Sequence, residues 1–140
     1  MSRRLDRWRG RLAADRPEVV VCRGGDCGSR RKHPQLDHVA QLARTQRELQ
    51  GEDVTVSVSK CLDECDRSNV MVVVPGRAAR DAGAQPVWMG RVLDDATTDA
   101  VIGCARTIGT QTEPSAEIAA HRFAPTRAGA IRRTSGGRVR

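Results

Sequence analysis

The chain has 140 residues, of which 39% are hydrophobic, and a net charge of +7. This length is enough for one domain with a hydrophobic core and is short for two. No stretch approaches the roughly 20 apolar residues of a membrane span. Residues 1–16 lack the apolar segment of a secretory signal peptide. These features argue against membrane-spanning and exported proteins, so we expect a cytoplasmic protein.

The positive charge is concentrated at the two ends of the chain. Residues 1–16 and residues 113–140 each contain six arginines and two acidic residues, whereas residues 17–112 carry a net charge of −1. The central part therefore gives no electrostatic reason to expect nucleic acid as a partner. The C-terminal arginines are interleaved with only one aromatic residue, Phe123. We expect at most non-specific, salt-sensitive nucleic-acid contacts from them.

Composition divides the chain into three predicted segments. They are a basic N-terminal arm (1–16), a folded domain (17–109) and a mostly disordered basic C-terminal tail (110–140). The arm has Leu5, Trp8 and Leu12 at helical spacing, although a solvated arm is favoured because isolated short helices are marginal. The tail is rich in Pro, Ser, Thr, Gly and Arg, and only Ile118 to Phe123 indicates a docked helical turn.

Four strands are predicted in the domain. Pro17 to Cys22 is a β-branched run typical of a buried strand, and Val54 to Ser59 alternates apolar and polar residues. Val70 to Val74 is continuously apolar and is predicted to lie in the centre of the sheet. After a hairpin loop from Pro75 to Pro86, the chain returns in a strand from Pro86 to Val92.

Two helices are predicted between and after these strands. Pro34 opens the first and Gly51 closes it. Asp94 or Asp95 caps the second. The apolar faces expected for the two helices comprise Leu36, Val39, Ala40, Leu42, Ala43 and Leu49 in the first, and Val101, Ile102, Ala105 and Ile108 in the second. The order β-α-β-β-β-α predicts an α/β domain with helices packed on a sheet, as in small thioredoxin-like domains.

Four of the five cysteines form two close pairs, each following a predicted strand. Cys22 and Cys27 enclose four residues, Cys61 and Cys65 enclose three, and 33 residues separate the pairs. The intervening helix and strand carry the chain out and back, so both pairs can reach one edge of the sheet. An odd cysteine count fits four ligands and one bystander better than a disulfide framework. The pairs therefore predict a four-thiolate metal or cluster site.

This spacing, on this order of elements, resembles the thioredoxin-like 2Fe–2S ferredoxins, and it is similar to the small 2Fe–2S subunit of respiratory complex I. The resemblance extends roughly from Glu18 to Ile108. Its most specific segments are Cys22-x4-Cys27, Cys61-Leu-Asp-Glu-Cys65, Asn69 to Pro75 and Pro86 to Gly90. The chain departs from many larger relatives at Ser68-Asn69, where they carry Gly or Pro.

The resemblance implies a function and a set of ligands. Cys22, Cys27, Cys61 and Cys65 would hold a 2Fe–2S cluster. The protein would carry one electron between redox partner proteins, with no enzymatic reaction of its own, and could form homodimers.

Other interpretations of the four thiols stay open. Zinc sites prefer closer cysteine pairs than these, but a zinc-stabilised binding module is the main alternative. Its basic arms would contact nucleic acid or an acidic protein. A redox-active dithiol is less favoured because neither pair is C-x-x-C. A sensor that signals by losing or oxidising its cluster is a third interpretation.

Several neighbours of the four cysteines bear on these interpretations. Glycines in the first loop permit tight turns that bring backbone N–H groups to the sulfurs. Basic neighbours would favour the reduced state of a cluster, and acidic neighbours would oppose this. The glycines are Gly24, Gly25 and Gly28, the basic residues Arg23, Lys60 and Arg67, and the acidic ones Asp26, Asp63, Glu64 and Asp66.

The remaining candidate residues have ordinary structural interpretations. Cys104 is expected to pack in the core of the last helix. Trp88 is expected in the core rather than as a docking anchor. His33 and His38 are expected to cap a helix or face solvent, although either could lie near a cluster. The basic run from Arg30 to Lys32 is predicted to be a solvated loop that could dock an acidic redox partner.

Overall fold

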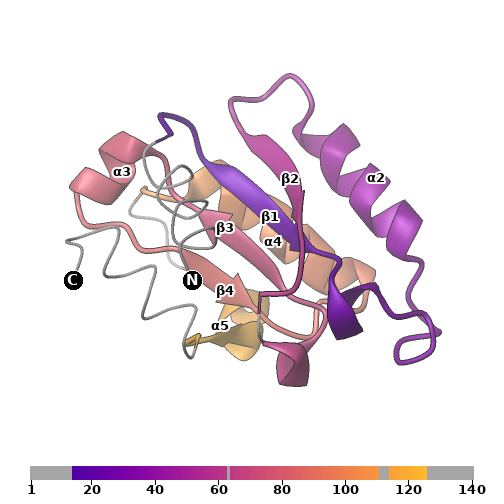
Figure 1. The fold of residues 1–140 in the computed structure, drawn as a ribbon. Helices are drawn as coiled ribbons and strands as arrows, with labels where there is room; N and C mark the ends of the chain where they lie inside the picture. The colour runs from indigo at the N-terminus through magenta and orange to yellow at the C-terminus, as the bar shows by residue number, and fades with distance from the viewer. Residues whose placement is uncertain (1–13, 63, 111–113, 126–140) are drawn as a thin grey trace.

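The computed structural model describes residues 14–62, 64–110 and 114–125 (Figure 1). The predicted helical pattern at Leu5, Trp8 and Leu12 lies outside the described residues. Within the described ranges, no helix is long and apolar enough to cross a membrane.

The centre of the fold is a mixed sheet of five strands in the order β2-β1-β3-β4-β5. β1 and β2 are parallel, and every other neighbouring pair is antiparallel. The strands are β1 (Glu18–Cys22), β2 (Thr55–Ser59), β3 (Met71–Val74), β4 (Val87–Met89) and β5 (Arg122–Phe123). The four predicted strands are thus confirmed, the fourth in shortened form, and β3 lies in the middle as expected. The predicted α/β class is confirmed.

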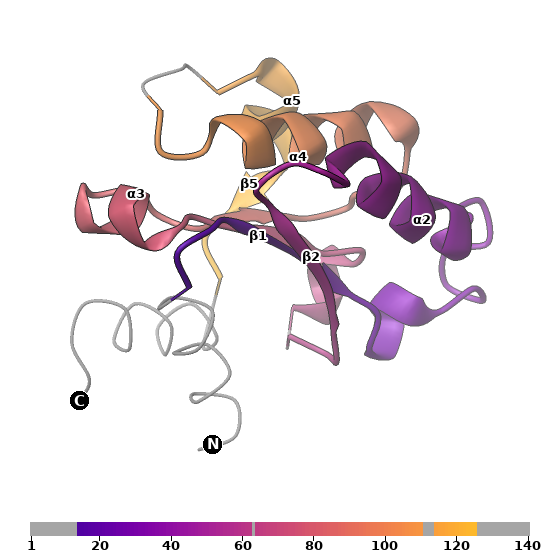
Figure 2. The same cartoon turned by 90° about the horizontal axis from the view of Figure 1, so that it is seen from above.

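The described helices are α2 (His38–Leu49), α3 (Arg77–Asp81), α4 (Asp95–Thr107) and α5 (Ala116–His121). Two short 3-10 helices, η1 (Gly25–Gly28) and η2 (Cys65–Arg67), follow β1 and β2. α2, α4 and α5 lie on one face of the sheet (Figure 2). The segment from Pro75 to Pro86 joins the antiparallel strands β3 and β4, as expected of a hairpin connection, but it contains the helix α3, which was not predicted.

The start and the buried face of α2 differ from the prediction. Asp37, not Pro34, begins the helix, because its Oδ1 accepts a hydrogen bond from Ala40 N at 2.9 Å. Gly51 follows the helix end with φ +82°, as expected of a terminating glycine. The expected apolar face is confirmed only in part, since Leu49 is buried and Leu42 packs on the core but Val39 is 64% exposed. The helix also buries His38, Gln41 and Thr45.

Hydrogen bonds explain this partly polar face. Gln41 Nε2 donates to Val92 O at 3.0 Å and lies 3.1 Å from Thr98 Oγ1. Thr45 Oγ1 donates to Gln41 O at 2.8 Å. Buried polar groups are tolerated when they are bonded in this way. The side chain of Gln41 therefore joins α2 to α4 and to the segment before it.

The last predicted helix is present as α4. Asp94 caps it, accepting a hydrogen bond from Thr97 N at 2.8 Å. Val101, Ile102 and Ala105 are buried, as expected. The docked turn predicted after the domain is present as α5, and the chain then adds β5 to the sheet edge next to β4.

The core has two parts, one on each face of the sheet, because successive strand residues point in opposite directions. Val19, Val21, Met71 and Val73 face the helices, together with Cys104 of α4. On the opposite face lies the second cluster, formed by Val20, Cys22, Cys27, Leu62, Val70, Val72, Val74, Trp88 and Phe123. Trp88 is 1% exposed, which confirms its predicted place in the core.

Candidate metal-cluster site

The two cysteine pairs lie at one end of the sheet because β1 and β2 are parallel neighbours. Cys22 at the end of β1 is the register partner of Ser59 at the end of β2. Arg23 N donates to Ser59 O at 3.0 Å just beyond, so the two loops leave the sheet together. η1 and η2 contact each other at this end, which lies at the bottom of Figure 1. We call Cys22 and the described residues of these loops, 23–36, 60–62 and 64–69, the thiol edge.

Within the thiol edge the four sulfurs form two neighbouring pairs. Cys61 Sγ and Cys65 Sγ are 3.5 Å apart. Cys22 and Cys27 are joined by a hydrogen bond between their thiols. Cys22 Sγ lies 3.7 Å from the carbonyl oxygen of Lys60, which directly precedes Cys61, so the second pair lies close to the first. The described residues contain no group of three or more His, Cys, Asp or Glu side chains that could hold a metal ion.

The pairs differ in exposure. Cys22 and Cys27 are 1% and 2% exposed and belong to the apolar cluster on the helix-free side of the described sheet. Cys61 is exposed and Cys65 is half-buried. Any group held between the pairs would therefore face the interior on one side and solvent on the other.

Glycines leave the space in which the loops meet. A Cβ on Gly24 would lie 2.1 Å from Cys61 N, and one on Gly28 would lie 2.2 Å from Arg23 O. Gly25 has φ +56°, and a Cβ there would lie 3.3 Å from Cys65 Sγ and 3.6 Å from Cys61 Sγ. The first loop can thus pass across the second cysteine pair only with glycine at these positions.

Backbone and side-chain donors hold the first pair in place. Val70 N lies 3.3 Å from Cys27 Sγ, to which it donates a hydrogen bond. Asn69 Nδ2 donates to Cys27 O at 2.6 Å. Cys22 N donates to Val70 O at 3.1 Å. The residues that lead into β3 therefore fix both cysteines of the first loop.

The hydrogen bond between the buried thiols makes them electrostatically unequal. Accepting from Cys27 lowers the pKa of Cys22 to about 6, although burial opposes this shift. The same hydrogen bond and burial raise the pKa of Cys27. Cys22 is thus the thiol of this pair that ionises first, which suits a metal ligand.

Arg23 is the basic residue that is built into the site. It donates to Cys22 O at 3.1 Å, to His38 O at 3.0 Å and to Gln41 Oε1 at 2.7 Å. Burial lowers its pKa, and the two thiols of the first pair act in the opposite direction. Its guanidinium is therefore a fixed positive charge beside Cys22 and Cys27.

His33 and His38 are buried, so neither has the solvent-facing position that was one of the roles expected for them. His33 is 8% exposed, and its Nε2 lies 2.8 Å from Ser68 Oγ. His38, the first residue of α2, is 7% exposed, and its carbonyl oxygen accepts a hydrogen bond from Arg23. Burial lowers the pKa of each, so the neutral imidazole is favoured.

Gln41 was not singled out from the sequence, and Ser68 and Asn69 were noted only as a departure from the ferredoxin pattern. Gln41 orients Arg23, while Ser68 and Asn69 tie η2 and β3 to the first loop. The departure marked the position of these two residues but did not predict their contacts. No local pattern marks a glutamine in mid-helix.

Cys104 lies away from the other four cysteines. It is 7% exposed on α4, among the apolar residues on the opposite face of the sheet. Burial raises its pKa to about 11, which favours the uncharged thiol.

Lys32 of the basic run reaches the second pair, with Nζ 2.8 Å from Asp26 Oδ2 and 3.3 Å from Cys65 O.

No protein-family model matches the chain, and no curated protein or solved structure is significantly similar to it.

Proposed function

We propose that the protein is a one-electron carrier that holds a 2Fe–2S cluster on Cys22, Cys27, Cys61 and Cys65. The observation that carries this proposal is the meeting of both cysteine pairs at one end of the sheet, although 33 residues separate them in the sequence. Two adjacent thiol pairs match the ligand set of a two-iron cluster, which takes two thiolates at each iron.

The sheet supports a thioredoxin-like assignment of the fold. β1, α2 and β2 form a parallel β-α-β unit, and β3 and β4 continue the sheet as an antiparallel pair on the other side of β1. This is the arrangement expected from the predicted order of elements. α3, α5 and β5 are then additions to that arrangement.

The residues around the thiols fit an anionic cluster. The side chain missing at Gly25 leaves room directly beside Cys61 Sγ and Cys65 Sγ. Val70 N–H donates to the sulfur of Cys27, and the guanidinium of Arg23 lies beside the first pair. Hydrogen bonds to sulfur and nearby positive charge stabilise a cluster and raise its reduction potential.

When bound, such a cluster would accept and release a single electron. The chain's own residues would then supply position, hydrogen bonds and exclusion of water. Cys22 and Cys27 lie in an apolar cluster, whereas Cys61 borders solvent. A redox centre arranged in this way is protected on one side and accessible to a partner on the other.

Anaerobic purification followed by visible absorption and by iron and sulfide analysis tests the proposal. We expect a red-brown protein with about two irons and two sulfides per chain, bleached by dithionite. A colourless protein that contains zinc would overturn the proposal in favour of the zinc-stabilised binding module. A colourless protein without metal would overturn both.

The ligand assignment is tested by cysteine variants. Cys61→Ser should abolish or strongly reduce the visible absorption because a ligand is lost. Cys104→Ser is the matched control, since Cys104 lies on the other face of the sheet. Equal loss of colour in the two variants would contradict the assignment.

A further inference from the structure

We propose that the basic side chains around Cys61 and Cys65 form the docking surface for an acidic redox partner protein. This inference rests on the proposed electron-carrier function and adds the chemistry of the partner and its place of contact.

An electron held by the four cysteines would have the shortest path to the protein surface at the thiol edge. Cys61 is exposed and Cys65 is half-buried, while the other two cysteines are almost completely covered. A partner that contacts the loop from Lys60 to Arg67 would therefore reach the exposed side of the site.

The charged groups that border this loop are mainly basic. Exposed basic side chains comprise Arg30, Arg31, Lys32, Lys60, Arg67 and Arg91. Arg91 belongs to the border because its N–H donates to Arg67 O at 2.8 Å. Asp26 is paired with Lys32 at 2.8 Å, so these two charges offset each other. Of the other described acidic residues of the thiol edge, Glu64 is 7% exposed and Asp66 faces outward, against the five remaining exposed arginine and lysine side chains.

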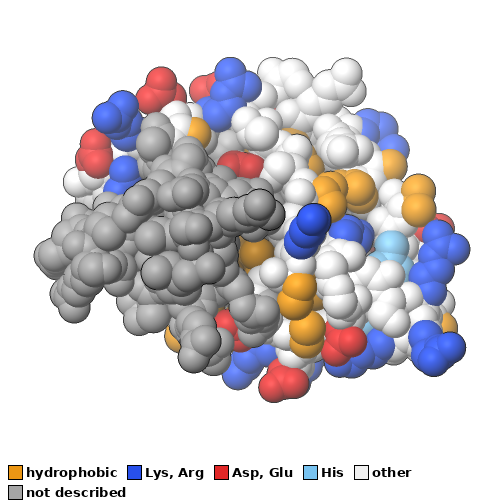
Figure 3. Space-filling model, in the orientation of Figure 1, with side chains coloured by type: hydrophobic (Ala, Val, Ile, Leu, Met, Phe, Trp, Pro, Cys, Tyr) orange, Lys and Arg blue, Asp and Glu red, His pale blue; other side chains and the backbone are white. Residues whose placement is uncertain are grey.

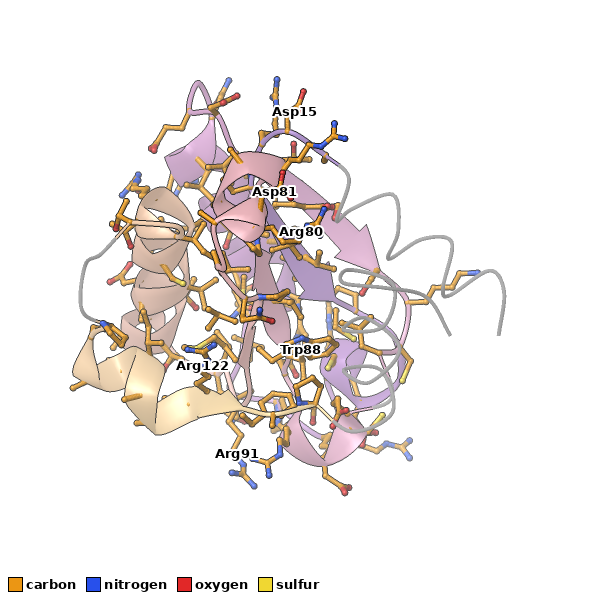
Figure 4. The ribbon with its side chains drawn as sticks, turned by 90° about the vertical axis from the view of Figure 1, so that its left-hand side faces the viewer. Asp15, Arg80, Asp81, Trp88, Arg91 and Arg122 are labelled. Carbon is orange, nitrogen blue, oxygen red and sulfur yellow. The ribbon has the colours of Figure 1, made fainter. Side chains whose placement is uncertain are left out.

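This excess is local rather than a property of the whole domain. The described residues contain 14 basic and 14 acidic side chains. At the far end of the sheet, basic and acidic groups are paired, as in Arg16 with Asp53 and Arg106 with Glu52. Figure 4 shows Arg91 beside η2 at one end of the molecule and Asp15, Arg80 and Asp81, of both signs of charge, toward the other.

The basic side chains near the thiol edge are distributed over a broad part of the surface. In Figure 3 several Lys and Arg side chains lie at the lower right, over the loop between η1 and α2, with acidic side chains along the lower edge. Such a surface attracts an acidic partner and orients it on approach. Basic side chains around an exposed redox site are therefore placed where they would act on the encounter complex.

A protein partner fits this surface better than a nucleic acid. Single-stranded nucleic acids bind basic grooves in which aromatic side chains stack on the bases. The aromatic side chains of the described chain, Trp88 and Phe123, are 1% and 8% exposed. They pack against each other with their ring centres 6.0 Å apart, so neither offers a stacking platform.

The test measures how reduced protein gives one electron to two small oxidants of opposite charge. Anionic hexacyanoferrate(III), which becomes hexacyanoferrate(II), and a cationic cobalt(III) phenanthroline complex, which becomes cobalt(II), serve as probes. Lys60→Glu and Arg31→Glu reverse charges at the thiol edge. Arg77→Glu makes the same change in net charge at the far end, at the start of α3, where an acidic side chain is tolerated.

At low salt, the two thiol-edge variants should react roughly two- to tenfold more slowly with the anionic oxidant and faster with the cationic one. Arg77→Glu should change both rates little, and high salt should remove the differences. The reduction potential of each variant is measured so that rates are compared at equal driving force.

Equal responses of Lys60→Glu and Arg77→Glu in a coloured protein would overturn the docking proposal and leave the electron-carrier function intact. A colourless protein would overturn both. If the thiol-edge variants lose salt-sensitive binding to a short DNA while their rates with both oxidants stay unchanged, the basic surface serves nucleic acid and the docking proposal is also overturned.

Discussion

The proposed site requires a residue without a side chain at position 25, which is Gly25. Its φ of +56° is a left-handed conformation, and a Cβ would come within 3.3 Å of Cys65 Sγ. Backbone strain and crowding of the thiols thus coincide at one position. Gly51 has an equally left-handed backbone, with φ +82°, but a Cβ there would meet nothing within 4 Å. A substitution at Gly51 should therefore cause backbone strain alone, whereas one at Gly25 should cause strain and also fill the space beside the thiols.

Gly25→Ala should therefore lower the iron content and the visible absorption. Gly51→Ala should leave both unchanged. Each substitution should cost about 1–2 kcal/mol of stability because alanine is strained at positive φ. Iron analysis and urea unfolding of both variants check this. A colourless Gly51→Ala protein, or a fully loaded Gly25→Ala protein, would show that the space beside Cys61 and Cys65 is not where the cluster lies.

At the scale of elements, the C-terminal α5 and β5 brace the loop that carries Cys65. The guanidinium of Arg67 lies 4.8 Å from the centre of the Phe123 ring. Gly90 fits between them, since a Cβ there would lie 3.0 Å from Arg67 Cβ and 3.2 Å from the ring. Gly90 also exchanges hydrogen bonds with His121, at 3.0 Å from its own N–H and 2.9 Å from its carbonyl. Phe123 of β5 therefore supports η2 through the ring contact with Arg67, while His121 of α5 holds Gly90 beside them.

Phe123→Ala should loosen η2 and speed the loss of iron to a chelator several-fold, because Arg67 loses its support. Ile118→Ala is the matched control, since Ile118 is also 8% exposed but packs on the helical side of the sheet. Both should lower the free energy of unfolding by about 2–5 kcal/mol. Iron loss is followed in native buffer, where both variants remain folded. Equally fast loss from both would mean that general stability, not the brace, controls retention of the cluster.

The buried face of α2 shows what the sequence could not predict at this scale. Hydrophobicity placed Val39 inside, but the structure buries Gln41 and Thr45. Their partners are distant in sequence, as Val92 and Thr98 are for Gln41. The helical spacing of residues shows which of them share a face of α2. Hydrogen bonds to other elements determine which of these faces is buried. The cap at Asp94 and the glycine after α2 were predictable because their partners are local.

At the scale of the whole molecule, the strands and the placement of the cysteine pairs could be predicted because both follow from short-range patterns and one topological rule. Four apolar runs gave four strands, and a β-α-β unit brought Cys22 and Ser59 into register. The pairing of His33 with Ser68 and the addition of β5 could not be predicted, since no local pattern or topological rule specifies these partners. The burial of His33 against Ser68 places a titratable side chain in the interior, so stability should depend on pH.

The buried histidines should make the molecule less stable as the solution becomes acidic. Burial lowers the pKa of His33 and of His38 below the ordinary value of about 6.5. Between the lowered values and about 6.5, the unfolded chain binds more protons than the native protein. The free energy of unfolding should therefore fall as the pH decreases through that window and be fully retained above it. Arg23, whose Nη2 donates to His38 O, adds repulsion to a protonated His38.

Urea unfolding between about pH 8 and pH 5.5 measures this dependence. His38→Gln removes one titrating ring, so the variant should lose less stability on acidification than the unaltered protein, even if it is less stable at neutral pH. His121→Gln is the control, because His121 is only partly buried. If the His38 and His121 variants keep the same pH dependence as the unaltered protein, acidic side chains or the thiols govern the acid sensitivity, and the burial of His38 contributes nothing to it.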